Sequence, residues 1–231
     1  TLECWVKTNS SDITQSLIMK GNSYSGGKRF VLGIQGADND QFPEGGIYSG
    51  IDDGDNESKL HYQYPLNNNE WYYLVSVFDR DSGAGNLYIN GELVDSEDIS
   101  NVVGNINNVY NLKIGTHSQF DSENMMNGLI DQVRIWNRPL TIEEIQSNMN
   151  VEFSQEQNGL VGYWKFDEND GGETAYDHSG NQNHGTIYGA SWIDNFIHGD
   201  IDLNSYIDIS DLVILIEYIL EPEDTYLTDE Q

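Results

Sequence analysis

The sequence is poor in cysteine and in long apolar runs. Cys4 is the single cysteine of the 231 residues, so no disulfide can form within the chain. Cys4 alternates with Leu2 and Val6, and this pattern predicts a buried, unreactive thiol on a strand. No apolar run approaches the roughly 18 residues that a membrane-spanning helix needs. We therefore expect no insertion into a membrane.

Basic residues are scarce as well. The chain has 10 Lys and Arg against 39 Asp and Glu, which gives a formal net charge of −29. A charge of this sign argues against nucleic acid and anionic membranes as partners. It fits simple solubility, and it fits the binding of divalent cations. The spacing of the acidic residues has to separate these two interpretations.

Short segments of alternating polarity follow one another as far as residue 166. Strands are expected at residues 2–7, 17–20, 29–34, 60–64, 71–78, 87–89, 92–94, 109–115 and 159–166, with a further strand inside 45–49. Asn90-Gly91 predicts a two-residue type I′ hairpin turn. The acid-rich stretch 36–58 is expected to be mainly loop. Many short strands with almost no helix predict an all-β, antiparallel sandwich.

Residues 127–146 combine a strong strand with a clear helix start. Leu129, Val133 and Ile135 share one parity of this strand, and Arg134 and Trp136 share the other. Asp131 falls on the apolar parity, so its carboxylate must be hydrogen-bonded, hold a metal or lie at a strand end. Thr141 and Glu144 have the spacing of a capping box, which predicts a short helix.

Several of these segments carry a family resemblance. TLECWVK (1–7), EWYYLVSV (70–77), LYINGELV (87–94) and the strand and helix of 127–146 resemble, in this order, laminin-G-like jelly-roll domains of the concanavalin A-like lectin/glucanase superfamily. Residues 159–192 resemble a segment that accompanies such domains. The resemblance implies a jelly roll over residues 1–193, with its first strand outside this sequence. It implies little about function, because the fold hosts lectins, adhesion modules and hydrolases.

Catalytic motifs are missing from the sequence. The retaining glucanases that this superfamily contains carry a Glu-x-Asp-x-x-Glu strand, and no such triplet occurs here. The histidines (His61, His117, His178, His184 and His198) show no metal-ligand spacing, and no Ser-His or Cys-His elbow motif is present. We therefore expect a binding module and not an enzyme.

Residues 200–211, DIDLNSYIDISD, have the donor spacing of an EF-hand calcium loop. Side-chain oxygens fall at loop positions 1, 3, 5, 9 and 12, and position 7 offers a backbone carbonyl: Asp200, Asp202, Asn204, Asp208 and Asp211, with Tyr206 at position 7. This number of hard oxygen donors favours Ca²⁺ over transition metals. The alternative is an acidic linker that caps the helix after it.

The same segment resembles a dockerin type I repeat, in which a loop ending in Asp runs directly into an apolar helix. The resemblance implies a linker at 194–199, a repeat at 200–231 whose second copy lies outside this sequence, and a cohesin-like or other protein partner. Ile209 and Ser210 would contribute to partner recognition. The helix is apolar on nearly all sides and must be buried, so Leu215 is expected in the contact.

A second cation site is a further hypothesis. Asp177, Ser179, Asn181 and Asn183 alternate in the loop 176–185. This pattern fits a set of Asx turns around Gly180. It also fits a calcium loop with Asp177 and Asn181 as ligands and Asp131 beside them.

These observations together predict an extracellular or cell-surface binding module, with Ca²⁺ as its cofactor and a glycan or a protein as its ligand. One alternative is a structural subunit of a surface layer or filament, and another is an ancillary domain of a larger secreted glycoside hydrolase. No ligand residues are assigned. Candidates for stacking on a sugar are Tyr24, Tyr48, Tyr62 and Tyr64.

Overall fold

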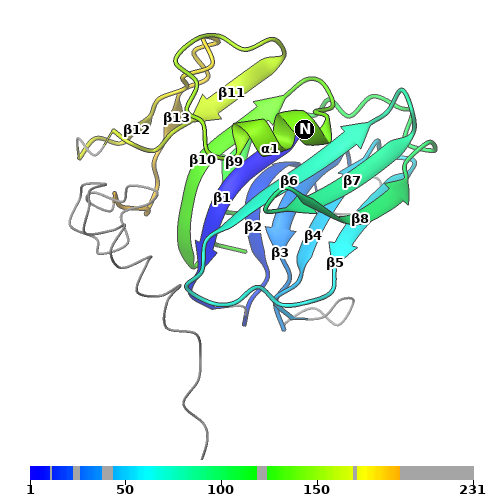
Figure 1. Cartoon of the computed structure of the whole chain (residues 1–231), viewed down its shortest axis with the longest axis horizontal. Coiled ribbons are helices and arrows are strands. Elements are labelled where there is room, and N and C mark those ends of the chain that lie inside the picture. Colours follow the sequence, from blue (N-terminus) through cyan, green and yellow to red (C-terminus); the bar gives the residue numbers. More distant parts are fainter. Residues whose placement is uncertain (11, 23–26, 38–43, 119–123, 169–170, 193–231) are drawn as a thin grey trace, which may run out of the picture. The chain divides into compact units, whose positions relative to one another are not determined.

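The computed structural model describes residues 1–10, 12–22, 27–37, 44–118, 124–168 and 171–192. The chain divides into two units: Thr1–Phe166 with Thr174–Thr186, and Asp167–Glu173 with Ile187–Gln231. Over the described ranges, no helix is long and apolar enough to cross a membrane. The first unit is mostly β, with two antiparallel sheets packed as a sandwich and a short helix, which confirms the predicted fold class for this part (Figure 1).

The described strands of the first sheet lie in the order β11-β10-β1-β6-β7-β8. Their bounds are β1 (Leu2–Thr8), β6 (Tyr72–Asp79), β7 (Ala84–Ile89), β8 (Glu92–Asp98), β10 (Gly128–Trp136) and β11 (Leu160–Trp164). The β7–β8 turn has Asn90 at φ 51° and Gly91 at φ 78°. Positive φ at both central residues is the type I′ geometry predicted for this pair.

The second sheet has the order β5-β4-β3-β2-β9 over the described residues. Its strands are β2 (Gln15–Gly21), β3 (Arg29–Ile34), β4 (Ile47–Asp52), β5 (Glu57–Tyr62) and β9 (Lys113–Ile114). A separate pair, β12 (Thr174–Ala175) and β13 (Gly185–Thr186), forms a small hairpin.

The strand expected inside 45–49 forms as β4, and the other described residues of 36–58 are loop or turn except for the start of β5. β4 and β5 form a hairpin around the turn at Asp53, whose Oδ1 accepts hydrogen bonds from the N–H groups of Asp55 and Asn56. One sequence-based expectation about this sheet is wrong: the strand expected at 109–115 shrinks to β9. Side-chain oxygens of Asn105 and Asn108 accept backbone N–H groups two residues on, which turns the chain just before β9.

The interior between the two sheets follows the predicted parity of β1. Leu2, Cys4 and Val6 are at most 4% exposed, and burial raises the pKa of the Cys4 thiol well above its usual value. The Ser49 hydroxyl of the second sheet donates a hydrogen bond of 2.6 Å to the Ser76 hydroxyl of the first sheet, across the core. Cys4 is therefore a packing residue, as its alternation predicted.

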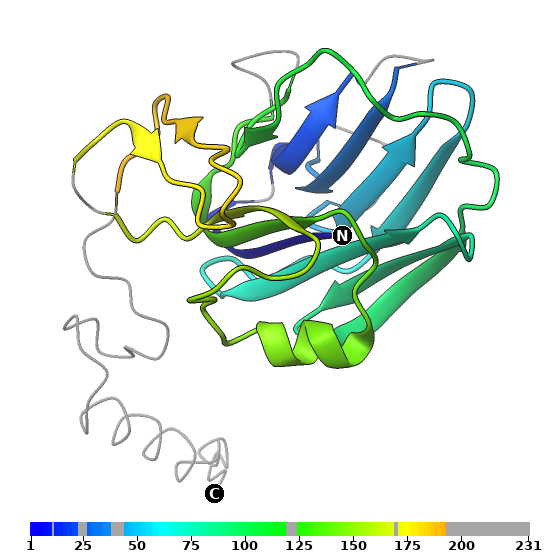
Figure 2. The same cartoon turned by 90° about the horizontal axis from the view of Figure 1, so that it is seen from above.

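Helix α1 (Ile142–Asn148) lies against the other face of the first sheet, on the side away from the second sheet (Figure 2). Its N-terminus confirms the predicted capping box: the Thr141 hydroxyl accepts the Glu144 N–H, and the Glu144 carboxylate accepts the Thr141 N–H. Ile145 is fully buried in a cluster with Trp136 and Tyr163. The sheet is thus covered on both faces.

A β-bulge in β10 overturns the parity expected for this strand. Glu3 pairs with Arg134, whereas Trp5, two residues on, pairs with Asp131, so the interval holds one more residue on β10 than on β1. Gln132, inside the interval, has φ 49°. The extra residue puts Leu129 and Asp131, which pair with Lys7 and Trp5, on the same face as Arg134, which pairs with Glu3. This face is covered by α1 and the chain after it, so Arg134 is 1% exposed.

Candidate functional site: the outward face of the second sheet

A groove runs over the outward face of the second sheet. Three rows of cross-strand neighbours underlie it: Ser16, Gly33, Tyr48 and His61; Met19, Val31, Gly50 and Lys59; and, at one end, Arg29, Asp52 and Glu57. Gly33 and Asp52 belong to these rows but do not line the groove itself. Thr14, Gln35, His117 and Asn124 also line it. The floor is therefore mixed, with apolar, aromatic and charged side chains on adjacent strands.

Strict alternation places these side chains outward. On β4 the inward residues Ile47, Ser49 and Ile51 are nearly fully buried, and Tyr48 between them is half-buried. A Cβ at Gly33 would lie 2.5 Å from ring atoms of Tyr48, so this ring lies across a position that has no side chain of its own. The Tyr48 and Ser16 hydroxyl oxygens are 3.4 Å apart. The result is an aromatic surface at the centre of the groove.

An ion-pair cluster occupies one end of the groove. The Glu57 carboxylate contacts Arg29 through Oε1 and Lys59 through Oε2, the latter at 3.0 Å. Burial favours a raised Glu57 pKa, but the two cations outweigh it, and the pKa lies below its usual value. Glu57 is therefore a carboxylate at neutral pH. Its role is to hold the two cations in place.

His61 links this face to the edge of the other sheet. Its backbone N–H donates to Asp95 Oδ2 of β8 at 2.7 Å, which satisfies a donor on edge strand β5. Burial lowers the pKa of the His61 imidazole; Lys59 lowers it further, while Asp95 and Glu57 oppose this. The imidazole is thus more strongly neutral at physiological pH than an exposed histidine.

The predicted stacking tyrosines are separated by the structure. Tyr48 is in the groove, and Tyr24 lies outside the described residues. Tyr62 and Tyr64 instead form an edge-to-face pair with centroids 5.5 Å apart, and neither lines the groove; Tyr64 is 60% exposed.

The predicted second cation site finds no support in the geometry. Asp177 Oδ1 accepts the N–H groups of Tyr163 and Ser179, and its Oδ2 accepts that of Asn183. Asn181 turns its amide nitrogen, and not its oxygen, toward backbone carbonyls of β11. Asp131 accepts the N–H of Gln132. These contacts explain the loop as Asx turns, and the cation at Asp131, Asp177 and Asn181 stays a prediction.

The remaining predicted sites lie outside the described residues. These are the loop ligands Asp200, Asp202, Asn204, Tyr206, Asp208 and Asp211 and the partner residues Ile209, Ser210 and Leu215. Across the described ranges, no three His, Cys, Asp or Glu side chains gather in a way that would hold a metal ion.

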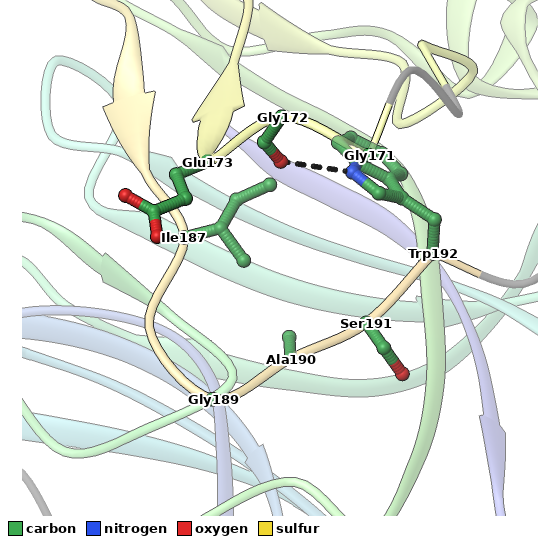
Figure 3. Close-up of a pocket in the computed structure, with 8 residues that line it drawn as sticks. All are labelled: Gly171, Gly172, Glu173, Ile187, Gly189, Ala190, Ser191 and Trp192. Atoms are coloured by element: carbon green, nitrogen blue, oxygen red, sulfur yellow. Dashed lines mark hydrogen bonds between the residues drawn. The ribbon is translucent and has the colours of Figure 1, made fainter.

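The second unit contributes one described hollow (Figure 3). Three glycines and Trp192 form much of its wall, and the Trp192 indole N–H donates to the Gly172 carbonyl at 3.1 Å. Glu173 is its only ionisable lining residue among those described. This hollow offers little chemistry compared with the groove.

Sequence reasoning missed most of the groove. The sequence alone gives no role to Arg29, places Glu57 in the acid-rich stretch 36–58 that is expected to be mainly loop, and shows no metal-ligand spacing for His61 and His117. A signal was present in the alternation of Glu57, Lys59 and His61 on one strand parity. Assigning it to a shared site required the cross-strand register, which pairs these residues with Asp52, Gly50 and Tyr48.

The antiparallel sandwich with an open, polar and aromatic groove on one sheet is the architecture of a lectin-like jelly-roll domain. The chain belongs to the concanavalin A-like lectin/glucanases superfamily, whose family model matches residues 1–146. This confirms the resemblance for the jelly roll. Nothing in the comparisons points to a dockerin repeat, and a search of curated proteins finds no match.

Solved structures share the fold at low identity. A candidate carbohydrate binding protein from Bacteroides ovatus ATCC 8483 is 21% identical with a TM-score of 0.64, and the match covers 80% of this chain and 53% of that one. The CBM40 of the Ruminococcus gnavus IT-sialidase is 22% identical with a TM-score of 0.50, over 63% of this chain and 79% of that one. The chain thus spans about half the length of the Bacteroides protein.

Proposed function

We propose that the chain is a non-catalytic carbohydrate-binding module whose ligand lies in the groove of the second sheet. The observation that carries this proposal is the Tyr48 ring lying across Gly33, with polar side chains from the neighbouring strands around it. An aromatic face contacts the C–H face of a sugar ring, and surrounding polar groups reach its hydroxyls. The description of the Bacteroides ovatus protein supports the same ligand class.

The acid content of the groove supports binding without hydrolysis. Glycoside hydrolysis usually needs two carboxyl groups on either side of the scissile bond. Among the described lining residues, Glu57 is the only carboxylate, and Arg29 and Lys59 hold it. A role as an ancillary module of a larger extracellular protein fits this arrangement, and the R. gnavus CBM40 belongs to a sialidase.

Replacing Tyr48 with alanine tests the proposal. We expect glycan affinity to fall about fivefold or more, because the loss of one aromatic stacking surface costs on the order of 1–3 kcal/mol for nucleic-acid bases, and a sugar packs on a ring face in the same way. A glycan array identifies ligands for the whole chain, and calorimetry compares the variants. Tyr64→Ala is the matched control, because Tyr64 is exposed outside the groove. Loss of binding in Tyr64→Ala alone, or no glycan bound by the chain, would contradict the proposal.

We also propose that residues 200–211 bind Ca²⁺ and attach the module to a cohesin-like or other protein partner. The donor spacing of the loop supports this proposal. Calcium titrated into the whole chain should give a binding heat that Asp200→Ala removes, whereas Asp177→Asn should retain it. Equal heats from the chain and Asp200→Ala would show that this loop is not the site.

A further inference from the structure

Resting on the carbohydrate-binding function above, we propose that the groove selects a sugar that bears a carboxylate. Arg29 and Lys59 would bind this carboxylate, and the Glu57 carboxylate takes its place in the free protein.

Cationic side chains outnumber carboxylates among the described residues that line the groove. Two of the 10 Lys and Arg residues line the groove, but among the described residues only one of the 39 Asp and Glu residues does so. Asp52 lies in register between Arg29 and Glu57, but it is 7% exposed and its Oδ1 accepts the Gly54 N–H. In a chain of net charge −29, an anionic ligand is repelled from most surfaces. The groove is a place where that repulsion is locally offset.

Arg29 and Lys59 converge on a single carboxylate, that of Glu57. Arg29 contacts the Glu57 carboxylate through its NH2 group. A guanidinium has five N–H donors in a planar fork that matches a carboxylate. The Lys59 side chain is 37% exposed and brings an ammonium to the same carboxylate from two residues further along β5, the strand that carries Glu57. The two cations thus already bind one carboxylate, and a ligand carboxylate would bind in its place.

The effect of replacing Glu57 distinguishes a carboxylate-bearing sugar from a neutral sugar. An incoming ligand carboxylate competes with the Glu57 carboxylate for both cations and is repelled by it. Glu57→Gln removes the competitor and should therefore tighten an acidic ligand. A neutral sugar would instead use Glu57 as an acceptor for its hydroxyls, so the same substitution should weaken it.

The experiment compares matched probes on the whole chain. Calorimetry would use sialyllactose against lactose, glucuronate-terminated against glucose-terminated oligosaccharides, and a sulfated galactoside as the alternative anion. We expect only carboxylate-bearing probes to bind tightly, with affinity that falls as salt rises. Glu57→Gln should tighten them roughly threefold or more, and Arg29→Gln or Lys59→Gln should weaken them about tenfold or more.

The chain offers a matched control pair outside the groove. Lys165 contacts Glu152 at 3.0 Å, the same distance as Lys59 to Glu57. Glu152→Gln and Lys165→Gln should leave affinity unchanged, which excludes a general effect of net charge. Lys59→Gln alters a partly exposed side chain, so it keeps the test valid even where Arg29→Gln fails to fold.

The outcomes separate this inference from the proposed function. Equal binding of neutral and acidic probes, weakened by Tyr48→Ala and by Glu57→Gln, would overturn the carboxylate selection and leave carbohydrate binding in place. Stronger binding of the sulfated probe would overturn the assignment to a carboxylate. Binding of no glycan at all would overturn both proposals.

Discussion

Replacement of Arg134 by methionine is expected to lower the free energy of unfolding by about 3–5 kcal/mol, the usual effect of removing one member of a buried ion pair. Arg134 is 1% exposed. Its NH1 group donates to the Asn148 carbonyl at 2.9 Å and lies 3.6 Å from Glu3 Oε2. Its guanidinium also lies over the rings of Phe153 and Tyr163, at 4.6 and 4.9 Å from their centroids.

Arg134 therefore connects β10 to the chain that follows α1. Its NH2 group donates to the Val151 carbonyl and to Gln132 Oε1, the side chain of the bulge residue. Methionine fills much of the volume but replaces none of these donors. The loss leaves backbone carbonyls without partners and the fully buried Glu3 without its cation.

Glu3 gives the prediction a pH dependence. Burial raises the Glu3 pKa, and Arg134 opposes that rise. A raised folded-state pKa means that the folded chain binds the proton more tightly than the unfolded chain. This contribution to stability is therefore present below the ordinary glutamate pKa of 4.5 and is lost as pH rises through the folded value. Without Arg134 the folded pKa rises further. The destabilisation by Arg134→Met should therefore grow between acidic and neutral pH.

Urea unfolding at several pH values measures this effect. Adding Glu3→Gln to Arg134→Met should recover part of the lost stability at neutral pH, because it removes the uncompensated charge. Lys165→Met is the control, because Lys165 pairs with Glu152, whose side chain is 57% exposed. This substitution should change the free energy of unfolding by about 1 kcal/mol or less. This account would be refuted if Arg134→Met lost no more stability than Lys165→Met, or if its loss did not depend on pH.

The elements predicted well from sequence are those fixed by local chemistry. The capping box at Thr141 and Glu144 and the Asn90-Gly91 turn each depend on a few neighbouring residues, and both form as predicted. The inward parity of β1 followed from simple alternation. No long-range information was needed for any of these.

The errors arose where distant strands decide the outcome. The bulge at Gln132 becomes visible only when β10 is paired with β1, and it puts Leu129 and Asp131 on the face opposite to Ile135, although all three share one parity in the sequence. The buried guanidinium of Arg134 donates hydrogen bonds to the backbone carbonyls of residues 148 and 151, which a single sequence does not place beside it. The groove likewise depends on the register of β2 to β5. A single sequence does not contain these pairings in readable form.

Replacement of Asp177 by alanine is the second large expected effect, a loss of about 3 kcal/mol or more. Asp177 is 7% exposed, and its two oxygens accept the N–H groups of Tyr163, Ser179 and Asn183 at 2.8–2.9 Å. Hydrogen bonds to a charged group contribute about 1.5–3 kcal/mol each, and a buried donor left without a partner is costly. Asp177→Asn keeps an acceptor oxygen and should lose less.

The pH dependence of this contribution has the opposite sign to that of Glu3. Burial favours a raised Asp177 pKa, but hydrogen bonds from Ser179, Tyr163 and Asn183 outweigh it and hold the pKa below its usual value. A depressed folded-state pKa gives stability that is present above the ordinary aspartate pKa of 3.8 and is lost as pH falls through the folded value. Asp177→Ala should thus cost less in acid than at neutral pH.

The same variant separates the hydrogen-bond role of Asp177 from the predicted second calcium site. Hydrogen exchange should show faster exchange of the Tyr163 and Asn183 amides in Asp177→Ala, and urea unfolding gives the total loss. Both are measured in an Asp200→Ala background, so that calcium at residues 200–211 does not contribute. If hydrogen bonds alone hold the loop, EDTA leaves the stability of this Asp177-containing chain unchanged. A loss of stability on adding EDTA, equal to that of Asp177→Ala, would assign a cation to Asp177 and overturn the hydrogen-bond account.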